Sequence, residues 1–518
     1  MKQSRREPLV RVQHFLRIGC LVAALISASG CSDKSSQSED GAVKQSDAQV
    51  PQDAAERELR ERPAGAAADI SEEITGGKGP FVASANGLDL PAGYVDHEYV
   101  AFGTASAYRA SGTLSDDGHW SLEPSSSAAY RTRVLVLSPE DVARASGTVI
   151  VEWLNVSGGA DANPEYTSLA EEIVRAGHIW VGVSAQLIGV EGGPVLVKAP
   201  GGDDLAGKGL KAIDPDRYGS LQHPGDGFSF DIFSQVARAV LNGGAILRGA
   251  KLKTLLAAGE SQSAFALTTY YNGVQPLTRV FDGFLLHSRG AASLPLVEPG
   301  KSADLAGSIG GSVHPVLRDD LDAPVLDLQA EGDLTGLLGS SAVRQPDSDR
   351  FRLWEVAGTA HADAHLVGPL ADTLDCGVPI NHGPLHVVAK AALKALDAWV
   401  RTGKQPPGAP RLELTNDEPP TISRNGDGIA LAGIRTPPVD VPVEALSGAA
   451  GPNSEVICLL LGSSQPLSAA RVAALYTDRG DYMRQYEAAT DRAIHSGFVL
   501  EADRAALLAF AQPSRIEQ

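Results

Sequence analysis

A serine in the segment 254–264 has the sequence surroundings of a catalytic nucleophile. An apolar run precedes Ser261, and a helix-compatible stretch, residues 264–271, follows it. A strand that turns sharply into a helix would hold Ser261 at its apex. The strained backbone of such a turn requires small residues two positions before and two positions after the serine. Gly259 and Ser263 meet that requirement, so Ser261 is the candidate nucleophile.

An acid and a base that could serve this serine follow it in the chain. A nucleophilic serine needs a base to take its proton and a carboxylate to orient that base. Asp333 comes just after the apolar run 325–328 and is the first candidate for the acid, with Glu331 on the same turn as the reserve. His361 lies in the loop after the next apolar run, 352–356, and is the candidate base. The three residue types would cleave an acyl bond through a covalent acyl-enzyme.

The loop around His361 also admits a second kind of chemistry. His361, Asp363 and His365 alternate along the chain and could ligate a metal ion, so a metal-dependent hydrolase is an alternative. His365 is also the reserve for the base. Serine chemistry needs no metal or other cofactor, and none is expected. We interpret the other singly scattered histidines as loop or core residues with satisfied nitrogens, namely His223, His287 and His382.

An oxyanion hole would need two backbone N–H groups aimed at the developing negative charge. Gln262, directly after the candidate nucleophile, would supply one of them. The other would come from the loop 155–159, where Val156 and Ser157 are both candidates because the glycines there let the backbone approach a substrate closely. Ser184 also follows an apolar run, but no helix-compatible segment follows it at once, so it is a poor candidate nucleophile.

Alternating apolar runs and helical patterns would position these residues. Near-continuous apolar runs are typical of strands that are covered on both faces of a parallel sheet. Such runs occur at 148–154, 178–183, 254–257, 283–286, 325–328 and 352–356. Helix-compatible segments separate several of them, at 166–176, 230–247 and 264–274. The pattern predicts an α/β fold with a mostly parallel, doubly wound sheet, and the long connections 186–227 and 288–321 are interpreted as lid-like loops.

The composition limits the classes of partner. The chain has 518 residues, of which 43% are hydrophobic, and its net charge is −19 at pH 7. This size and apolar fraction allow a large core. Because the chain is strongly acidic and has no basic cluster after residue 30, nucleic acid is not expected as a partner.

The first 30 residues have the pattern of a signal peptide. Basic residues precede a short apolar run, 18–26, and small residues follow it at 28–30. Cys31 comes next and resembles the lipid-modified cysteine of bacterial lipoproteins. Ser32 replaces the Asp that retains many such proteins in the inner membrane, which favours the outer membrane. We therefore expect an exported protein that is lipid-anchored in the bacterial cell envelope, at the outer membrane or the periplasmic face.

The rest of the chain divides into a tether and a domain. Residues 31–78 are rich in small and polar residues and are predicted to form a disordered tether. Residues 79–518 are predicted to form the α/β domain with a C-terminal helical extension. Because an exported domain folds in an oxidising compartment, Cys376 and Cys458 are predicted to form a disulfide.

Several longer motifs resemble an exported, largely bacterial family of α/β-hydrolase domains whose nucleophile elbow reads Gly-x-Ser-Gln-Ser. The resembling stretches are 151–159, 217–226, 259–263, 355–363, Cys376 with 380–381, and the tail 476–511. The resemblance extends from about residue 80 to the C-terminus. It implies a serine-hydrolase fold with Ser261 and His361 in a triad, and it leaves the choice between Asp333 and Glu331 open.

The leading hypothesis is therefore a lipid-anchored serine hydrolase that cleaves a carboxylic ester, in a small molecule or a polymer, outside the cytoplasm. Ser261 would attack, His361 would carry the proton and Asp333 would orient the imidazole. A second hypothesis is a binding lipoprotein that kept the fold and lost the chemistry. The metal-dependent hydrolase with His361, Asp363 and His365 is the third.

Overall fold

The computed structural model describes residues 62–84, 87–88, 90–198, 205–311 and 313–516. Its contacts divide the chain into the units Met1–Ala54 and Ala55–Gln518. The first unit lies outside the described residues, and with it the predicted signal peptide, the lipidation site Cys31 and most of the predicted tether. All structural statements below concern the second unit.

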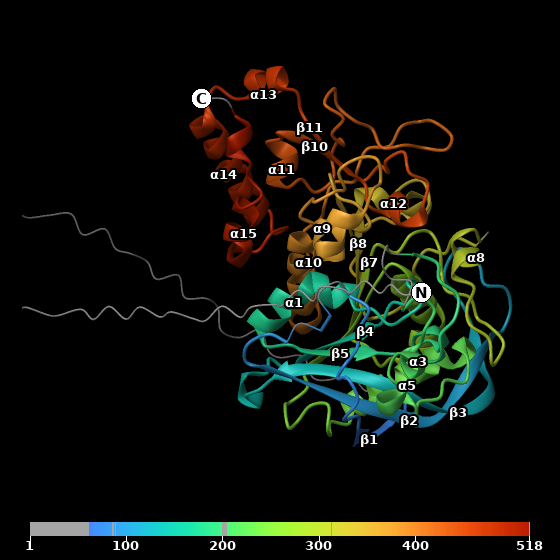
Figure 1. Ribbon diagram of the computed structural model, residues 1–518. Coiled ribbons are helices and arrows are strands. Elements are labelled where there is room, and N and C mark those ends of the chain that lie inside the picture. Colours follow the sequence, from blue (N-terminus) through green and yellow to red (C-terminus); the bar gives the residue numbers. More distant parts are fainter. Residues whose placement is uncertain (1–61, 85–86, 89, 199–204, 312, 517–518) are drawn as a thin grey trace, which may run out of the picture. The chain divides into compact units, whose positions relative to one another are not determined.

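A nine-stranded sheet runs through this unit in the described residues (Figure 1). Its strand order is β1-β2-β3-β5-β4-β6-β7-β8-β9. The strands are β1 (Asp69–Glu73), β2 (Tyr94–Ala110), β3 (Leu122–Pro139), β4 (Thr148–Trp153), β5 (Ile179–Val183), β6 (Thr254–Glu260), β7 (Gly283–His287), β8 (Val325–Ala330) and β9 (Phe351–Val356). The neighbours from β5 to β9 are parallel, whereas β1, β2 and β3 form antiparallel pairs and β3 is antiparallel to β5.

Every residue of the six parallel strands is buried. This explains their apolar runs, because a strand covered on both faces has no solvent-facing positions that would favour polar side chains. The predicted α/β class, with its mostly parallel and doubly wound sheet, is confirmed.

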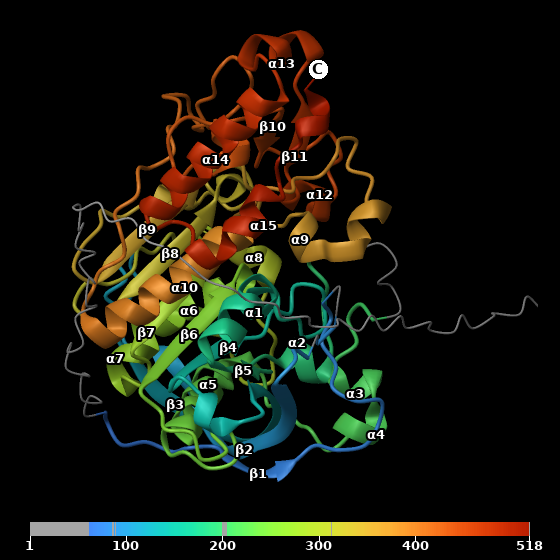
Figure 2. The same cartoon turned by 90° about the vertical axis from the view of Figure 1, so that its left-hand side faces the viewer.

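Helices cover both faces of the sheet. On one face, α1 (Pro164–Ala176) and α10 (Leu385–Thr402) pack together against the parallel strands (Figure 2). On the other face, α5 (Ser229–Leu241) and α6 (Gln262–Thr269) contribute to the larger core cluster. The bounds of α1 follow from its sequence: Pro164 fits the first turn, and Gly177 ends the helix with φ 71°.

Shorter helices occupy the connections and the C-terminal part. They are α2 (Leu187–Glu191), α3 (Leu210–Ile213), α4 (Pro215–Tyr218), α7 (Gln275–Thr278), α8 (Leu305–Ile309), α9 (Ala364–Val367), α11 (Pro437–Asp440), α12 (Val456–Leu460), α13 (Ala469–Leu475), the longer α14 (Arg479–His495) and α15 (Arg504–Leu508). Strands β10 (Glu444–Ser447) and β11 (Ser463–Pro466) form a separate antiparallel pair. None of the helices in the described residues is both long and apolar enough to cross a membrane.

The C-terminal helices are tied to the rest of the unit by ion pairs to the buried Asp503. Asp503, next to α15, pairs with Lys390 on α10 at 3.0 Å and with Arg175 on α1 at 3.0 Å. Tyr482 and Tyr486 of α14 are buried in a small apolar cluster of their own. The tail is thus a helical extension that packs on the same two helices that cover the sheet.

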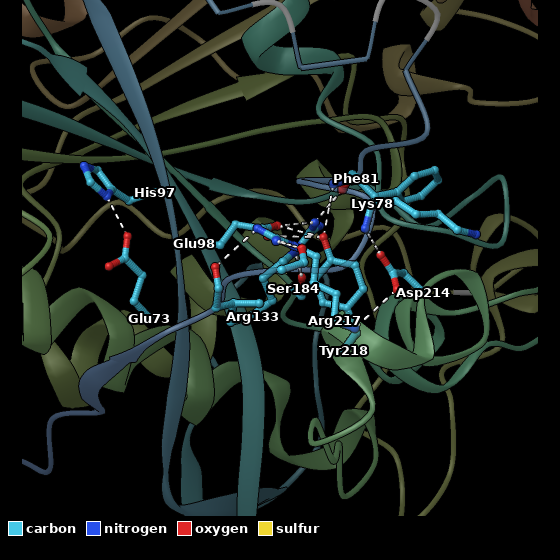
Figure 3. A network of polar contacts seen from close by, with 12 residues as sticks. Glu73, Lys78, Phe81, His97, Glu98, Arg133, Ser184, Asp214, Arg217 and Tyr218 are labelled. Atoms are coloured by element: carbon cyan, nitrogen blue, oxygen red, sulfur yellow. Dashed lines mark hydrogen bonds and ion pairs between the residues drawn. The ribbon is translucent and has the colours of Figure 1, made fainter.

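The predicted boundary between tether and domain at residue 79 is too late. Residues 69–73 form β1, the edge strand that pairs with β2, although this segment is rich in acidic residues. Arg62 pairs with Asp282 at 2.7 Å. The Lys78 N–H donates to Asp214 at 2.5 Å, a contact that Figure 3 shows. An edge strand needs only one neighbour and tolerates charged, exposed side chains, so its composition resembles that of a tether.

Candidate active site

The turn between β6 and α6 holds Ser261 in a strained backbone conformation. Ser261 directly precedes α6 and has φ 62° and ψ −124°, a region that residues other than glycine rarely adopt. A Cβ added to Gly259 would lie 2.9 Å from the Cβ of Ser263, so the segment on both sides of the serine must be small. This is the strand-to-helix elbow that the sequence predicts.

Ser261, His361 and Asp333 are joined by two hydrogen bonds. His361 Nε2 is 2.8 Å from Ser261 Oγ, and His361 Nδ1 is 2.7 Å from Asp333 Oδ1. Asp333 is fully buried, and its Oδ2 accepts the N–H of Ala330 at 2.6 Å, which orients the carboxylate. Ser261, His361 and Asp333 follow β6, β9 and β8, respectively. They lie close together because the carboxyl ends of the parallel strands meet at one edge of the sheet. The arrangement can pass the hydroxyl proton to an imidazole that a buried carboxylate stabilises.

Glu331, the reserve acid, contacts other groups. Its carboxylate accepts the backbone N–H groups of Gly358 at 2.7 Å and Gly448 at 2.9 Å. It also pairs with Arg424 at 2.5 Å. These bonds fasten the loop after β9 to the segment after β10. The structure therefore brings Asp333, and not Glu331, to His361.

The backbone N–H groups expected in an oxyanion hole lie on two adjoining segments. Gln262 opens α6, where the first N–H groups have no partner within the helix. The Val156 N–H donates to Gln262 Oε1 over 3.3 Å, and the Ser157 N–H donates to Asn155 Oδ1 over 2.8 Å. The side chain of Gln262 also donates to Gln186 at 2.7 Å. Val156 and Gln262 are thus brought together, whereas the N–H of Ser157 is used within its own turn.

A buried ion network anchors the loop between β4 and α1, which carries Val156 (Figure 3). The guanidinium of Arg133 bonds to Asp161 at 2.8 Å and to Glu98 at 3.1 Å, and all three side chains are fully buried. Ser184 Oγ donates to Asp161 and accepts from Arg133 Nε at 3.0 Å. Asp161 belongs to the loop between β4 and α1 that carries Val156. Ser184, the poor candidate nucleophile, therefore helps to hold that loop in place through its hydrogen bonds to Asp161 and Arg133.

A cavity of about 210 Å³ adjoins Ser261 and His361. One of its walls is apolar and comes from α9, the 3₁₀ turn after it and α12. The apolar side chains of that wall are Leu366, Val367, Leu370, Ile457 and Leu460. We refer to these five residues as the apolar wall.

The sources of this wall differ from the predicted lids. Among the described residues, the loop 186–227 reaches the cavity through Val197, and the loop 288–321 contributes no lining residue. The predicted disulfide between Cys376 and Cys458 is present and joins cysteines with a sequence separation of 82. It joins α12 to the segment that follows α9, so it links the two parts of the apolar wall.

The three residues of the metal hypothesis engage separate partners. His361 is used as described above, and the Asp363 carboxylate accepts the Leu366 N–H at 3.0 Å as the N-cap of α9. His365 stacks on His386 with ring centroids 3.7 Å apart. They therefore do not converge on one point. Among the described residues, two other groups have donor atoms close enough to share an ion: the exposed His119, Asp319 and Asp320, and the buried Glu165, Glu260 and His287.

For two of the three histidines predicted to have satisfied nitrogens, His223 and His382, both ring nitrogens have hydrogen-bond partners. His223 Nε2 bonds to the carbonyl of Ala185 at 2.9 Å and its Nδ1 accepts the N–H of Gly225 at 3.2 Å. His382 bonds to Glu444 at 2.7 Å and to Ser464 at 2.9 Å.

His287 is different, and the sequence interpretation of it is wrong. Its Nδ1 lies 3.0 Å from Glu165 and 3.6 Å from Glu260, while its Nε2 is buried without a hydrogen-bond partner in the described part of the chain. Burial by itself would lower the pKa of His287, but the two carboxylates outweigh it and raise that pKa to about 9. Burial, with a further contribution from Glu165, raises the pKa of Glu260 to about 7. The imidazole thus supplies the positive charge in this cluster.

The sequence does contain a signal for this cluster, because Glu260 and His287 both end apolar runs. Glu260 is the middle residue of the elbow motif, and His287 ends the next strand of the sheet. A charged side chain at the carboxyl end of a parallel strand lies at the edge where ligands bind, which makes it a candidate site residue.

A family match supports the α/β fold described above. The profile of the alpha/beta hydrolase domain family matches residues 63–509. No functionally curated protein matches the sequence.

Solved structures with similar folds include esterases. A fungal esterase from Rhizomucor miehei is 14% identical, with a TM-score of 0.31 over 61% of this chain and 86% of that chain. A thermostable esterase from Pseudomonas putida ECU1011 is 14% identical, with a TM-score of 0.30 over 61% of this chain and 85% of that chain. Likeness at this level carries no argument about activity.

The family match spans nearly all of the described residues, including the elbow at Ser261 and the strand ends that carry Asp333 and His361. This chain belongs to the alpha/beta hydrolase domain family.

Proposed function

We propose that this hydrolase cleaves a carboxylic ester through an acyl-enzyme formed on Ser261. The observation that carries the proposal is the pair of hydrogen bonds from His361 to Ser261 Oγ and to Asp333, at 2.8 Å and 2.7 Å. Ser261 Oγ attacks the ester carbonyl and gives its proton to His361 Nε2. The proton then passes to the leaving alcohol, and water releases the acid by the reverse sequence.

In the proposed mechanism, the oxyanion is stabilised by the N–H groups of Gln262 and Val156. The Val156 N–H bond to Gln262 Oε1 is long, at 3.3 Å, so exchanging that acceptor for an oxyanion costs little. The Ser157 N–H has a shorter bond of 2.8 Å to give up, which makes it the weaker candidate.

The test combines a covalent probe with a panel of chromogenic esters. A fluorophosphonate should label the wild-type protein and not Ser261→Ala, and ester turnover should fall by about 10⁴-fold in that variant. Ser468→Ala, which changes an exposed serine at the start of α13, is the matched control and should keep both signals. Folded Ser261→Ala with unchanged turnover would reject the proposal and favour a binding protein or another active centre.

We also propose that the enzyme is exported and held in the bacterial cell envelope by a lipid on Cys31. The support is the order of a basic segment, a short apolar run, small residues and Cys31 in the sequence. Metabolic labelling with a palmitate analogue should mark the full-length chain and not Cys31→Ser. Equal labelling of both would reject the anchor.

A further inference from the structure

A buried Glu–His–Glu cluster adjoins the elbow serine. Glu260 and His287 are register partners on the parallel strands β6 and β7, and Glu165 reaches them from the first turn of α1. None of the three side chains is more than 3% exposed. The carbonyl of His287 accepts the N–H of Ser261 at 2.9 Å, so the cluster and the nucleophile share the same piece of backbone.

Glu260 contacts both the cluster and the cavity. It lines the cavity together with Ser261 and His361. Its Oε2 is buried, and in the described residues it has no hydrogen-bond partner; the same holds for Glu165 Oε1. A buried carboxylate oxygen without a hydrogen bond is costly, and such groups concentrate where their charge is used.

The charges around Glu260 come from several elements. Burial has the largest effect on its pKa and raises it. The titratable groups that then act on it are, in decreasing order, His287 on β7, Glu165 on α1, and His361 and Asp363 after β9. The two histidines favour the ionised carboxylate, and the two acids oppose it. Because Glu260 and His361 line the same cavity, a negative charge on Glu260 lies at the site where the imidazole takes the proton in the proposed mechanism.

We propose that Glu260 is a positioning residue whose negative charge stabilises the imidazolium that His361 forms when it takes the proton of Ser261. The inference rests on the proposed ester hydrolysis. No bond to Glu260 forms or breaks, since the proton moves from Ser261 Oγ to His361 Nε2 and on to the leaving alcohol. His287, paired with Glu165, keeps Glu260 ionised in a site that would otherwise favour its protonated form.

The proposal has a pH signature. With a pKa of about 7, Glu260 is ionised above neutral pH and protonated below it. The stabilisation of His361 is therefore present at alkaline pH and absent at acid pH. Replacing Glu260 by an isosteric neutral residue should matter only where the wild-type side chain is charged.

The experiment measures kcat/KM for a chromogenic ester against pH in the wild type and in Glu260→Gln. We expect a deficit of about tenfold at about pH 8.5, where Glu260 is ionised, and near-equal rates at about pH 5.5, where it is protonated. Glu260→Asp, which keeps the charge, should restore most of the alkaline advantage. Glu355→Gln, a buried carboxylate that pairs with Arg344, controls for the loss of any buried acid and should change no limb of the profile.

A deficit in Glu260→Gln that is the same at every pH would assign a structural role and overturn the proposal, as would an unchanged profile. If Glu260→Gln does not fold, His287→Gln provides the test. Loss of the imidazolium should raise the pKa of Glu260 and move the ascending limb to higher pH, and an unmoved limb would overturn the proposal. Turnover that survives Ser261→Ala would reject the ester mechanism instead, so the two failures are distinguishable.

Discussion

Asp333 and Glu331 lie two residues apart after β8, and their carboxylates contact different groups. Asp333 is oriented from both sides, by His361 at 2.7 Å and by the Ala330 N–H at 2.6 Å. Glu331 satisfies the N–H groups of two loops and an arginine. Removing the charge of either residue should therefore have separable consequences.

Asp333→Asn should lower kcat by about 10³- to 10⁴-fold while leaving the fold intact, because the amide favours the wrong imidazole tautomer. Glu331→Gln should keep most of kcat in the folded protein and lose about 1–3 kcal/mol of stability, because it weakens buried hydrogen bonds to backbone N–H groups. Ester kinetics together with thermal melting of both variants provide the check. The opposite pattern would make Glu331 the acid.

At the scale of elements, α9 and α12 decide what the cavity can accept. Ile457 is buried and belongs to the apolar wall, whereas Leu459, two residues along the same helix, is 37% exposed. The disulfide between Cys376 and Cys458 fastens α12 to the segment after α9. The wall is thus built from two short helices. Because helices of this length are not stable in isolation, tertiary contacts must hold them in place.

Ile457→Asp should raise KM for esters with large apolar groups by about tenfold or more and leave acetate esters nearly unaffected. Each methylene group that contacts the wall is worth about 0.8 kcal/mol, and a buried charge removes that contact. Leu459→Asp is the matched control and should change neither KM. Equal effects of Ile457→Asp on all chain lengths would show that the ester does not contact this wall.

The disulfide should contribute to stability as well as to shape. Replacing Cys376 and Cys458 together by Ala should lower the free energy of unfolding by about 2–5 kcal/mol, because the bond closes a long loop in the unfolded chain. Denaturant unfolding of this double variant, and of the wild type with and without reductant, measures the effect. The reduced wild type should match the variant, and an unchanged midpoint in both would contradict the prediction.

For the whole molecule, the buried cluster couples stability to pH. The pKa of His287 is raised from 6.5 to about 9, so its contribution is complete below about pH 6.5 and is lost as pH rises through about 9. The pKa of Glu260 is raised from 4.5 to about 7, and its contribution is likewise lost as pH rises through about 7. Both groups bind their protons more tightly in the folded state, so they act in the same direction.

The melting temperature should therefore fall between about pH 6 and about pH 9.5. Over this interval the coupled pair should lose on the order of a few kcal/mol of its contribution to the free energy of unfolding. His287→Gln removes the group that titrates near pH 9 and should flatten the upper part of this decline. Melting curves across the pH series, at constant ionic strength, provide the measurement. A melting temperature that rises over this interval would contradict the assignment.

Much of the fold was readable from the sequence, because strands buried on both faces leave unbroken apolar runs such as 148–154 and 325–328. The edge strand β1 was missed, since its burial is slight and its pairing with β2 involves residues about 30 positions away. The small residues around Ser261 predicted the elbow, because the steric demand of that turn is met by neighbours in the sequence.

The sequence by itself determined which residue types end the parallel strands: Ser261, Asp333 and His361, each marked by the run before it. Only the tertiary structure decided which carboxylate meets His361, which N–H lies beside Gln262, and which helices wall the cavity. It also decided that Glu260 shares a buried site with His287. The contact of the Val156 N–H with Gln262 joins residues 106 positions apart, and Glu165 reaches His287 across 122 positions. No local pattern in the sequence records where such a side chain finds its partner.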